Sequence, residues 1–384
     1  MKELHSSELK LGIIAGGQLG KMLIQEASKW DITTYVLDAD PNSPASSIAS
    51  YHFEGSRFDY LAVYSFGKKV DILTFEIESI NVDALFKLKE EGVKVIPDPS
   101  ILKLFQNKEK QKEFYVSCGL PTSAFQSFDT KEDILDAIKQ DKLKYPFVQK
   151  LKTGGYDGRG VSVINSESDL RDLLDGESIV EEKVDIHKEI AVIVARNADG
   201  EVKSFPAVEM VFDAKANLVE RLICPADISE DHHKQAHDIA HKLMERLDMC
   251  GILAIEFFLD TSGNILINES APRTHNSGHH TIESVITSQF EQHLRAILNL
   301  PLGSTEIKMP SIMLNLLGET GYTGKVKYEG FNECLALDGV NIHLYGKKTT
   351  KPMRKMGHVT IIDKDFSNAL KKAEFVKNTL KVKA

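Results

Sequence analysis

The first hundred residues alternate short apolar runs with amphipathic stretches. The runs at 11–15, 32–38, 70–76 and 93–97 have the length and aliphatic composition of buried strands. Apolar residues recur at helical spacing over 19–27, directly after the first run, and a second helical stretch covers 82–91. Strands that alternate with helices in this way predict an open parallel α/β sheet.

A second region begins after the sequence PDPS at 97–100. The lysine- and glutamate-rich stretch from Ile101 to Cys118 predicts one helix. Strand-like segments then alternate with helical stretches at 131–139 and 231–249. The strand-like segments are 146–150, 160–164, 178–184, 189–196, 252–260 and 264–269. Apolar positions between 282 and 297 predict a single amphipathic helix, and a smaller region with strands near 342–345 and 358–362 follows.

Composition narrows the class of protein. The 384 residues are 42% hydrophobic and 27% charged with a net charge of −9, so we expect a soluble protein that does not bind nucleic acid. The first ten residues contain no apolar core of a secretory signal, and no run is long enough to span a membrane. Four widely separated cysteines are typical of a reducing cytoplasm.

The glycine turn AGGQLG at 15–20 lies between the first strand and the first helix. It matches a dinucleotide-binding turn imperfectly, with Gly17 and Gly20 in place and Asp38 near the position of a ribose-binding acid. A simple packing turn, or binding of another phosphate-bearing ligand at the helix N-terminus, are equally open interpretations. Glu76 lies at the carboxyl end of another predicted parallel strand, in the same region as this turn. It is either a residue of the site or a solvated acid.

A second glycine-rich loop, KLKTGGYDGRG at 150–160, joins two predicted strands. Its glycines can bring backbone N–H groups close to phosphates, and Lys150 at the end of the incoming strand adds a charge. The alternative is a surface hairpin, since Asp-Gly favours tight turns.

The sequence 251–270 predicts a hairpin that carries two acids. With a two-residue loop at Thr261 and Ser262, Glu256 and Glu269 share one face as diagonal neighbours about 7–8 Å apart. Carboxylates at this separation favour a bound Mg²⁺ ion, which also takes phosphate oxygens. A loop one residue longer or shorter turns one glutamate towards solvent, so a site without metal is the alternative.

The sequence NESAPRTHNSGHH at 268–280 concentrates polar side chains. The spacing of His275 and His279 suggests zinc, but neither a cysteine nor a third histidine completes a site. Arg273 offers a bidentate fork to an oxyanion, and a polar loop without chemistry is the remaining interpretation. The basic run at 345–355 is either a solvated loop or a phosphate-binding loop.

Three motifs together resemble one family. GGQLGKM, TGGYDGRG and NESAPRTHNSGHH, in this order, are similar to the ATP-grasp family of 5-(carboxyamino)imidazole ribonucleotide synthases, and the resemblance covers essentially the whole chain. It implies a mixed α/β and α+β ATP-grasp fold with three domains. We place a parallel α/β domain at 1–98, an ATP-grasp domain with a mobile lid around 120–185 at 99–298, and a small domain at 299–384.

The resemblance also implies the reaction. ATP, bicarbonate and 5-aminoimidazole ribonucleotide would give ADP, phosphate and the N-carboxylated ribonucleotide through carboxyphosphate, in a cytoplasmic homodimer of the purine pathway. The ATP-binding residues that it implies are Lys108, Lys150, Gly154, Gly155, Tyr156, Asp157, Gly158, Arg159, Gly160, Glu181, Glu182, Lys183, Val184, Glu189, Asn268 and Glu269. Among them, Glu181 and Val184 would line the adenine pocket, and Glu189 would bind the ribose hydroxyls. Glu256 and Glu269 would hold Mg²⁺.

The substrates would meet between the remaining motifs. The residues expected to border the ribonucleotide are Gln18, Leu19, Glu76, Tyr156, Lys347, Arg354 and Lys355. The residues expected to act on bicarbonate and the amine are Asp157, Arg159, Arg273, His275, Asn276 and Ser277. The sequence departs from the pattern of many ATP-grasp enzymes at Ala271, where those enzymes have a metal-binding asparagine.

Three alternatives remain at this point. Another ATP-grasp ligase that joins a carboxylic acid to an amine would share the ATP machinery. An NAD-dependent oxidoreductase would use the first glycine turn but leaves the second glycine loop and the acidic pair unexplained. A nucleotide-binding regulatory protein without turnover is the third.

Overall fold

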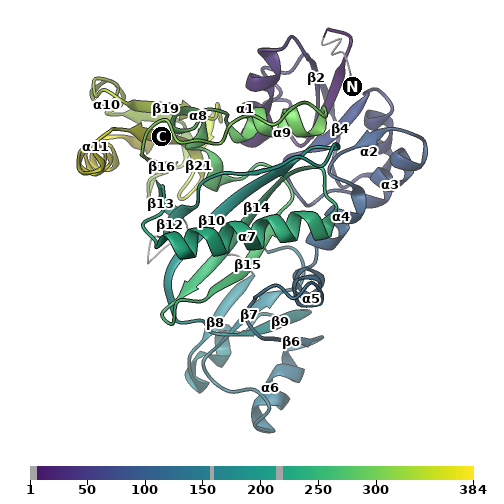
Figure 1. Cartoon of the computed structure of the whole chain (residues 1–384), viewed down its shortest axis with the longest axis vertical. Coiled ribbons are helices and arrows are strands. Elements are labelled where there is room, and N and C mark those ends of the chain that lie inside the picture. The colour runs from purple at the N-terminus through teal and green to yellow at the C-terminus, as the bar shows by residue number, and fades with distance from the viewer. Residues whose placement is uncertain (1–6, 156–159, 213–218) are drawn as a thin grey trace.

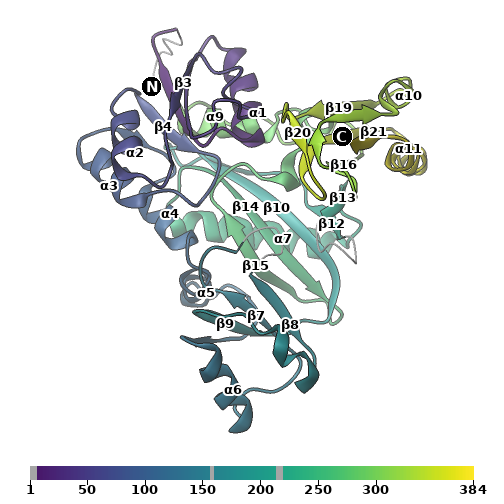
Figure 2. The same cartoon turned by 180° about the vertical axis from the view of Figure 1, so that it is seen from behind.

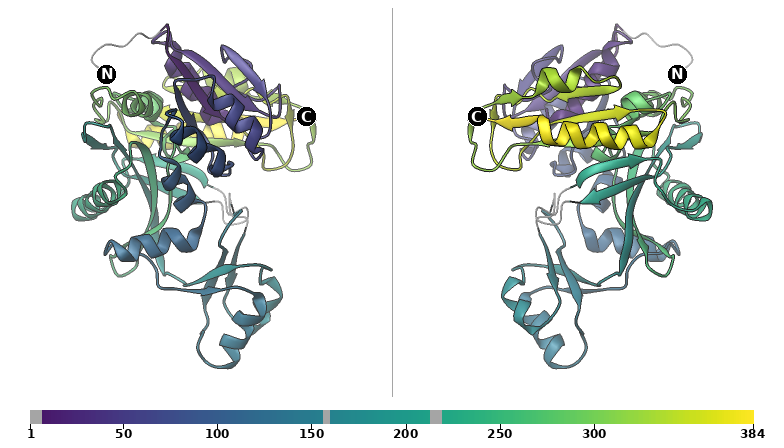
Figure 3. Two further views of the ribbon diagram at one scale, coloured as in Figure 1. Left: turned by 90° about the vertical axis from the view of Figure 1, so that its right-hand side faces the viewer. Right: turned by 90° about the vertical axis from the view of Figure 1, so that its left-hand side faces the viewer.

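The computed structural model describes residues 7–155, 160–212 and 219–384. Figures 1 and 2 show an N-terminal and a C-terminal part side by side at one end, joined by a long central sheet. A small sheet projects from the opposite end, and Figure 3 shows this projection from the side. Within the described ranges, no helix is both long and apolar enough to cross a membrane.

The N-terminal part is a five-stranded parallel sheet, as the sequence predicts, with the strand order β3-β2-β1-β4-β5. Its strands are β1 (Lys10–Ile14), β2 (Thr33–Asp38), β3 (Tyr51–Glu54), β4 (Ile72–Phe75) and β5 (Lys94–Val95). Its helices are α1 (Gln18–Ser28), α2 (Tyr60–Gly67) and α3 (Val82–Glu90). The pattern did not predict β3 or α2, because β3 is a short, half-exposed edge strand and the apolar residues of α2 do not form one stripe.

The two faces of this sheet belong to different cores. Leu11 and Ile13 pack with α1 and with α9 (Gln289–Ile297) from much later in the chain. Ile14 points to the other face and packs with α2 and α3. The N-terminal part is therefore fixed against the central part by a continuous apolar contact.

The predicted helix from Ile101 to Cys118 is in fact two helices, and that prediction was wrong. α4 (Pro99–Phe105) ends before Asn107, and α5 (Lys108–Ser117) begins after it. Asn107 is extended, and its side chain accepts a hydrogen bond from the Lys110 N–H as an N-cap. Because the chain turns here, Lys108 starts a new helix, and its N–H donates to the Lys152 carbonyl at 2.8 Å.

The projecting part is a four-stranded antiparallel sheet in the order β6-β9-β7-β8. Its elements are β6 (Phe125–Phe128), α6 (Lys131–Lys139), β7 (Phe147–Leu151), β8 (Val161–Ile164), the 3₁₀ helix η1 (Glu167–Asp172) and β9 (Ser178–Glu182). β7 and β8 are the two strands predicted around the second glycine loop, and they pair antiparallel. The sheet has its own small core around Phe147 and Val180.

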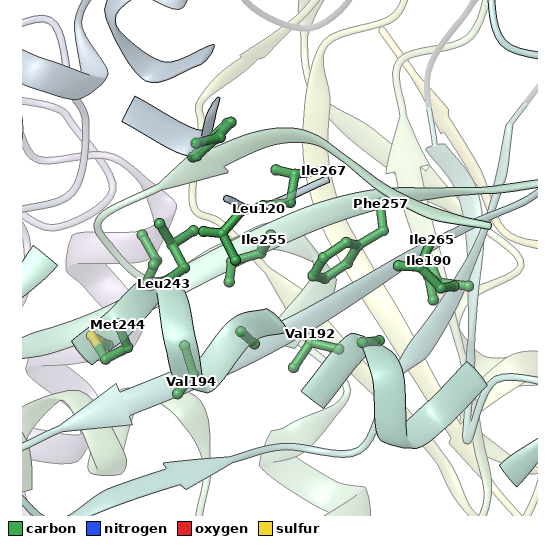
Figure 4. Close-up of a cluster of buried hydrophobic side chains, with 14 of the residues drawn as sticks. Leu120, Ile190, Val192, Val194, Leu243, Met244, Ile255, Phe257, Ile265 and Ile267 are labelled. Carbon is green, nitrogen blue, oxygen red and sulfur yellow. The ribbon is translucent and has the colours of Figure 1, made fainter. Parts of the chain in front are cut away.

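The central part is built on a nine-stranded sheet in the order β15-β14-β10-β12-β13-β16-β21-β19, with β11 on β10. Its first strands are β10 (Ile186–Arg196), β11 (Val202–Ser204), β12 (Val208–Phe212), β13 (Val219–Cys224), β14 (Gly251–Asp260) and β15 (Ile265–Ala271). Helix α7 (Glu230–Leu247) packs on one face of this sheet, and Figure 4 shows Leu243 and Met244 of α7 with Val192 and Val194 of β10. This is the larger core of the molecule.

The predicted register of the β14–β15 hairpin was wrong. Leu259 pairs with Ile265, and the Asp260 N–H donates to the Asn264 carbonyl, which leaves three residues, 261–263, in the loop instead of two. That change alone would turn Glu269 away from Glu256. A bulge at Asn268 adds a second shift, so Glu256 pairs directly with Glu269 and both acids share one face after all.

The single helix predicted for 282–297 is also interrupted. α8 (Thr281–Ser284) ends at Val285, which is extended and forms a bridge with Ile307, and α9 starts only at Gln289. Ser288 caps α9, since its side chain accepts from the Glu291 N–H. Ile286 is 53% exposed and does not belong to the predicted apolar face.

The C-terminal part continues the central sheet through β16 (Ser311–Leu317), β21 (Lys355–Ile362) and β19 (Val340–Leu344). β19 and β21 are the two strands predicted near 342–345 and 358–362. The smaller elements are β17 (Gly324–Lys325), β18 (Lys327–Glu329), α10 (Phe331–Leu335), β20 (Thr349–Thr350), α11 (Phe366–Thr379) and β22 (Lys381–Lys383). α11 covers the C-terminal core. The boundaries that we place at 98 and 298 stay a prediction.

Candidate active site

Two carboxylates and an amide meet on one face of the β14–β15 hairpin. The bulge sets both Asn268 and Glu269 opposite Glu256, where a regular ladder would allow only one of them. Burial, together with the nearby Glu269 and Glu189, raises the pKa of Glu256. The charge of Lys108 holds the pKa of Glu269 well below its usual range. The site therefore stabilises negative charge on one acid and disfavours it on the other unless a cation is added.

Three lysines surround this face. Lys108 forms an ion pair with Glu269, and Lys150 donates to the Asn268 Oδ1 at 2.7 Å. Lys150 also lies 3.1 Å from a carboxylate oxygen of Glu181. A narrow pocket opens between these groups, and its lining residues are Lys108, Gln111, Lys112, Lys150, Ile179, Glu181, Asn268 and Glu269.

Lys112 belongs to this site, although the sequence analysis did not single it out. Its side chain is 2% exposed, and its Nζ lies 3.2 Å from Glu181 and donates to the Ser123 hydroxyl at 2.6 Å. Burial lowers the pKa of Lys112 to about 8. The spacing from Lys108 to Lys112 puts both lysines on one face of α5, and this i,i+4 pattern could have identified it.

Other residues on the same face of α5 form hydrogen bonds with β15. The Tyr115 hydroxyl donates to Ser270 Oγ at 2.9 Å, and the Ser270 N–H donates to Gln111 Oε1 at 3.3 Å. Gln111 and Tyr115 follow Lys108 at three and seven residues, so one stripe of the helix carries all these contacts. The helix thus holds β15 against the four-stranded sheet.

Glu181 was expected to line an adenine pocket. Its side chain is buried, and its carboxylate faces both Lys112 and Lys150 and accepts from Ser123 at 2.8 Å. Glu182 ends β9, and Lys183 and Val184 follow on the link to β10; Glu182 and Lys183 are exposed. Two cations keep the pKa of Glu181 low despite burial.

Glu189 lies on β10 beside the acidic pair. It pairs with Phe258, so its side chain shares a face with Glu256 two residues away on β14. Burial raises the pKa of Glu189 to about 7, and the charge of Lys150 opposes this effect. The expected ribose-binding residue is thus adjacent to the acidic pair.

Only the two ends of the second glycine loop, 150–155 and Gly160, belong to the described residues. Gly154 and Gly160 have positive φ angles of 78° and 75°, which a residue with a Cβ rarely adopts. The Leu151 N–H donates to the Gly160 carbonyl at 2.9 Å and closes the base of the loop. Tyr156, Asp157, Gly158 and Arg159 lie outside the described residues.

The first glycine turn is filled by a carboxylate of the protein itself. Glu76 accepts hydrogen bonds from the N–H groups of Gly17 and Gly20 at the start of α1. A Cβ at Gly17 would lie 2.2 Å from Glu76 Oε1, so any other residue here would displace this carboxylate. Burial raises the pKa of Glu76 to about 7, although these hydrogen bonds oppose the rise. Asp38 in turn accepts from the Gly16 N–H at 2.7 Å. This arrangement favours the packing-turn interpretation over dinucleotide binding.

The segment from Arg273 to Ser277 connects the acidic pair to the N-terminal part. Arg273 Nε lies 2.8 Å from Glu78 Oε1, just beyond β4. His275 Nε2 lies 3.6 Å from Glu256 Oε1, and His275 Nδ1 is 2.9 Å from the Ser277 hydroxyl. The side-chain Nδ2 and Oδ1 atoms of Asn276 are both buried and have no hydrogen-bond partner among the described residues.

The zinc interpretation of this segment receives no support. His279 is 1% exposed and stacks on His358. Over the described ranges, no group of three or more His, Cys, Asp or Glu side chains could hold a metal ion by itself. A metal at Glu256 and Glu269 would accordingly need further oxygen ligands from a substrate.

The basic run at 345–355 forms a loop that faces the N-terminal part. Lys347 Nζ donates to the Lys355 carbonyl at 2.7 Å, and Arg354 donates to the Thr349 carbonyl at 2.7 Å. Lys21 of α1 donates to the Leu344 carbonyl at 3.0 Å. The start of α1 therefore lies in the same region as Lys347 and Lys355. Gln18 is partly exposed there, and Leu19 is buried.

Comparisons with known proteins agree with this architecture. Family models match the ribonucleotide synthetase preATP-grasp domain at 9–106, the ATP-grasp domain at 113–290 and the phosphoribosylaminoimidazole carboxylase C-terminal domain at 311–372. The chain is 38% identical to a chloroplastic phosphoribosylaminoimidazole carboxylase of Vigna aconitifolia, with 94% of this chain aligned, but spans only 65% of that protein's length.

Solved structures are similar over their full length. The N5-carboxyaminoimidazole ribonucleotide synthetase of Thermotoga maritima is 45% identical with a TM-score of 0.89, over 98% of this chain and 99% of that one. The synthase of Aspergillus clavatus, in complex with ADP and 5-aminoimidazole ribonucleotide, is 35% identical with a TM-score of 0.88, over 97% and 98% of the chains. The expected ATP-grasp fold is thereby confirmed, and this chain belongs to the N5-carboxyaminoimidazole ribonucleotide synthase family of ATP-grasp ligases.

Proposed function

We propose that this chain uses ATP and bicarbonate to carboxylate the exocyclic amine of 5-aminoimidazole ribonucleotide. The observation that carries the proposal is the bulged hairpin, which sets Glu256, Asn268 and Glu269 on one face beside Lys108 and Lys150. Phosphoryl transfer needs such positioning and charge neutralisation rather than a side-chain nucleophile. Because the chain belongs to this family, the NAD-dependent oxidoreductase is no longer an alternative.

The lysines would bind the phosphates of ATP. Lys108 and Lys150 each contact a polar partner on β15, so their ammonium groups are held at the mouth of the pocket. Glu181 and Glu189 border the same face, at the positions expected for the base and the ribose. The glycine loop, with Tyr156 to Arg159, would cover the phosphates through its backbone N–H groups.

Glu256 and Glu269 fit a Mg²⁺ ion. They lie directly opposite each other, and burial with like charge raises the pKa of Glu256, so a divalent cation between them would favour the ionised form of both. Ala271 supplies no ligand, and the Asn268 oxygen already accepts from Lys150. The phosphate oxygens of the nucleotide would complete the shell, and the ion would neutralise charge on the transferred phosphoryl group.

The segment from Arg273 to Ser277 would bind bicarbonate. The Asn276 side-chain amide, which has no hydrogen-bond partner in the described part of the chain, can both donate and accept, as one bicarbonate ion requires, and His275 lies next to Glu256. A bicarbonate oxygen would attack the γ-phosphorus and displace ADP, which gives carboxyphosphate. The amine of the ribonucleotide would then attack the carbonyl carbon, phosphate would leave, and Asp157 would accept the amine proton.

The ribonucleotide would lie between α1 and the basic loop. Glu76 supports the turn that carries Gln18 and Leu19, while Lys347, Arg354 and Lys355 would face the 5′-phosphate. A homodimer in the cytoplasm is part of the same proposal and follows from the family.

The test measures phosphate release and product formation with ATP and Mg²⁺. Bicarbonate and 5-aminoimidazole ribonucleotide are each added or omitted, and the carboxylated product is quantified. We expect full turnover only with both substrates, with equal amounts of phosphate and product. Absence of a carboxylated ribonucleotide under these conditions would refute the proposal, and turnover with an unrelated carboxylic acid and amine would favour the other ligase.

A further inference from the structure

Three histidine rings stack between the 268–280 segment and the C-terminal sheet. The ring centroids of His279 and His358 are 4.6 Å apart, and those of His358 and His343 are 4.4 Å apart with an angle of 8° between the planes. His279 and His358 are 1% and 0% exposed. Such a buried row of polar rings needs a reason, because apolar side chains would fill the same space without hydrogen-bonding requirements.

The stacked rings belong to segments that are far apart in the chain. His343 on β19 and His358 on β21 are direct partners in the antiparallel ladder, and these strands are the two stems of the basic loop 345–355. His279 directly follows the 3₁₀ helix η2 (Asn276–Gly278), which carries Asn276 and Ser277. The stack therefore connects the proposed bicarbonate segment to both stems of the basic loop.

Hydrogen bonds extend the stack in two directions. His343 Nε2 lies 2.8 Å from the Glu283 carboxylate on α8, which fixes the ring on the side of the central part. The Tyr345 hydroxyl lies 3.1 Å from His358 Nδ1, and Tyr345 is 2% exposed. Lys347 Nζ is 5.5 Å from the centroid of the Tyr345 ring. The Lys347 ammonium group, which donates to the Lys355 carbonyl, thus lies against the same ring whose hydroxyl meets His358.

The charge environment favours neutral rings. Burial lowers the pKa of both His279 and His358 well below the usual range, and the His279 ring lowers that of His358 further. His275, His280, His343 and Lys355 also face His279 and act in the same direction. Neutral imidazoles can stack closely, so the contact persists at the pH at which the enzyme would work.

We propose that His279, His358 and Tyr345 are positioning residues for the ribonucleotide. They would hold the basic loop 345–355 in register with Arg273–Ser277, so that the substrate's phosphate and its amine are fixed at one distance. This inference rests on the proposed function of both segments. Loss of the register would separate carboxyphosphate formation from capture by the amine, because bicarbonate would bind at Arg273–Ser277 and the phosphate of the ribonucleotide at the basic loop.

The test uses the full chain with His358→Leu and His358→Phe. For His358→Leu we expect a KM for the ribonucleotide that rises about tenfold or more, since small displacements of a bound group have large kinetic effects. The ratio of carboxylated product to phosphate should fall below one, while the KM for ATP stays within about twofold of the original. His358→Phe keeps a planar ring and should recover part of both losses.

His293→Leu is the matched control. His293 is also a buried histidine, 1% exposed, but it bonds to Thr74 and lies outside the stack. We expect it to lower the melting temperature without changing the product-to-phosphate ratio. An equal fall of that ratio in His293→Leu, or an unchanged ratio and KM in a folded His358→Leu, would overturn the inference.

Tyr345→Phe provides the test if His358→Leu does not fold. It removes only the hydroxyl group that meets His358, and it should raise the KM for the ribonucleotide in the same direction but less. An unchanged KM and product-to-phosphate ratio in this variant would likewise overturn the inference. A wild-type chain that forms no carboxylated ribonucleotide would instead refute the proposed function.

Discussion

Glu256 pairs directly with Glu269 across the β14–β15 ladder because Asn268 forms a bulge between them and the hairpin loop. A regular ladder from the same loop would place Asn268 opposite Glu256 and turn Glu269 to the other face. The bulge thus brings one amide and two acids to a single side of the sheet. It is a local irregularity with a direct chemical consequence.

Replacing one acid of this pair should abolish turnover. We expect Glu269→Gln to lower kcat by roughly a thousandfold, because the variant loses charge opposite Glu256 and the ion pair with Lys108. The measurement is phosphate release as a function of Mg²⁺ concentration, with Glu245→Gln on the exposed side of α7 as the control. Near-normal turnover of Glu269→Gln would remove the acidic pair from the mechanism.

Lys112 should matter for both stability and ATP binding. Lys112→Met breaks a buried ion pair with Glu181, so we expect unfolding to become easier by about 3 kcal/mol and the KM for ATP to rise. Lys110→Met is the control, because Lys110 lies two residues away on the exposed face of the same helix. It should change stability by less than about 0.5 kcal/mol. Similar unfolding curves for the two variants would show that the buried pair does not stabilise the fold.

The raised pKa of Glu189 makes stability depend on pH. Below the ordinary value of 4.5 the carboxyl is protonated in both states, and as pH rises towards 7 the unfolded chain releases its proton first. Stability from this group is therefore lost across that interval, by at most about 3 kcal/mol. Glu189→Gln stays neutral and should be more stable than the original chain at pH 8 but not at pH 4.5.

Urea unfolding of both proteins at the two pH values measures this effect. The same variant should bind ATP more weakly, since Glu189 is the expected ribose ligand. A stability difference that does not change with pH would show that Glu189 is not protonated more readily in the folded chain.

Arg273 allows a test that separates chemistry from nucleotide binding. Arg273→Lys keeps a charge but loses the guanidinium fork, so kcat should fall more than the affinity for ATP. Glu78→Gln is a useful companion, because it removes the partner of Arg273 at 2.8 Å and leaves the guanidinium in place. Equal losses of kcat and ATP affinity in Arg273→Lys would place this residue in the nucleotide site.

Element types could be read from the sequence where periodicity was strong, but breaks inside helices could not. The break at Asn107 depends on a side-chain cap, and apolar spacing carries no information about it. Val285 leaves the helical pattern because its backbone pairs with Ile307, which is a tertiary contact. Local pattern therefore predicted continuous helices where the chain forms two.

The same limit applies to the site. The glycine loop and the hairpin pattern pointed to Lys150 and both acids, and the family resemblance added Lys108. The register of Glu256 and Glu269 required the bulge. The spacing from Lys108 puts Lys112 on the same face of α5, but only the structure shows that this face is buried against β9. The stack of His279, His358 and His343 joins three distant segments, so no spacing in the sequence indicates it.

The continuous sheet has a consequence for dividing this chain into modules. β13 pairs with β16 on the far side of the predicted boundary at 298, with Leu222 opposite Met313. A chain cut near that boundary would leave N–H and C=O groups of β13 without their partners on β16. Such an exposed strand edge can pair with strands of other molecules and lead to aggregation. Because β13 also pairs with β12, a chimera between relatives that exchanges β16, β21 and β19 needs side chains that still match β13 across this ladder.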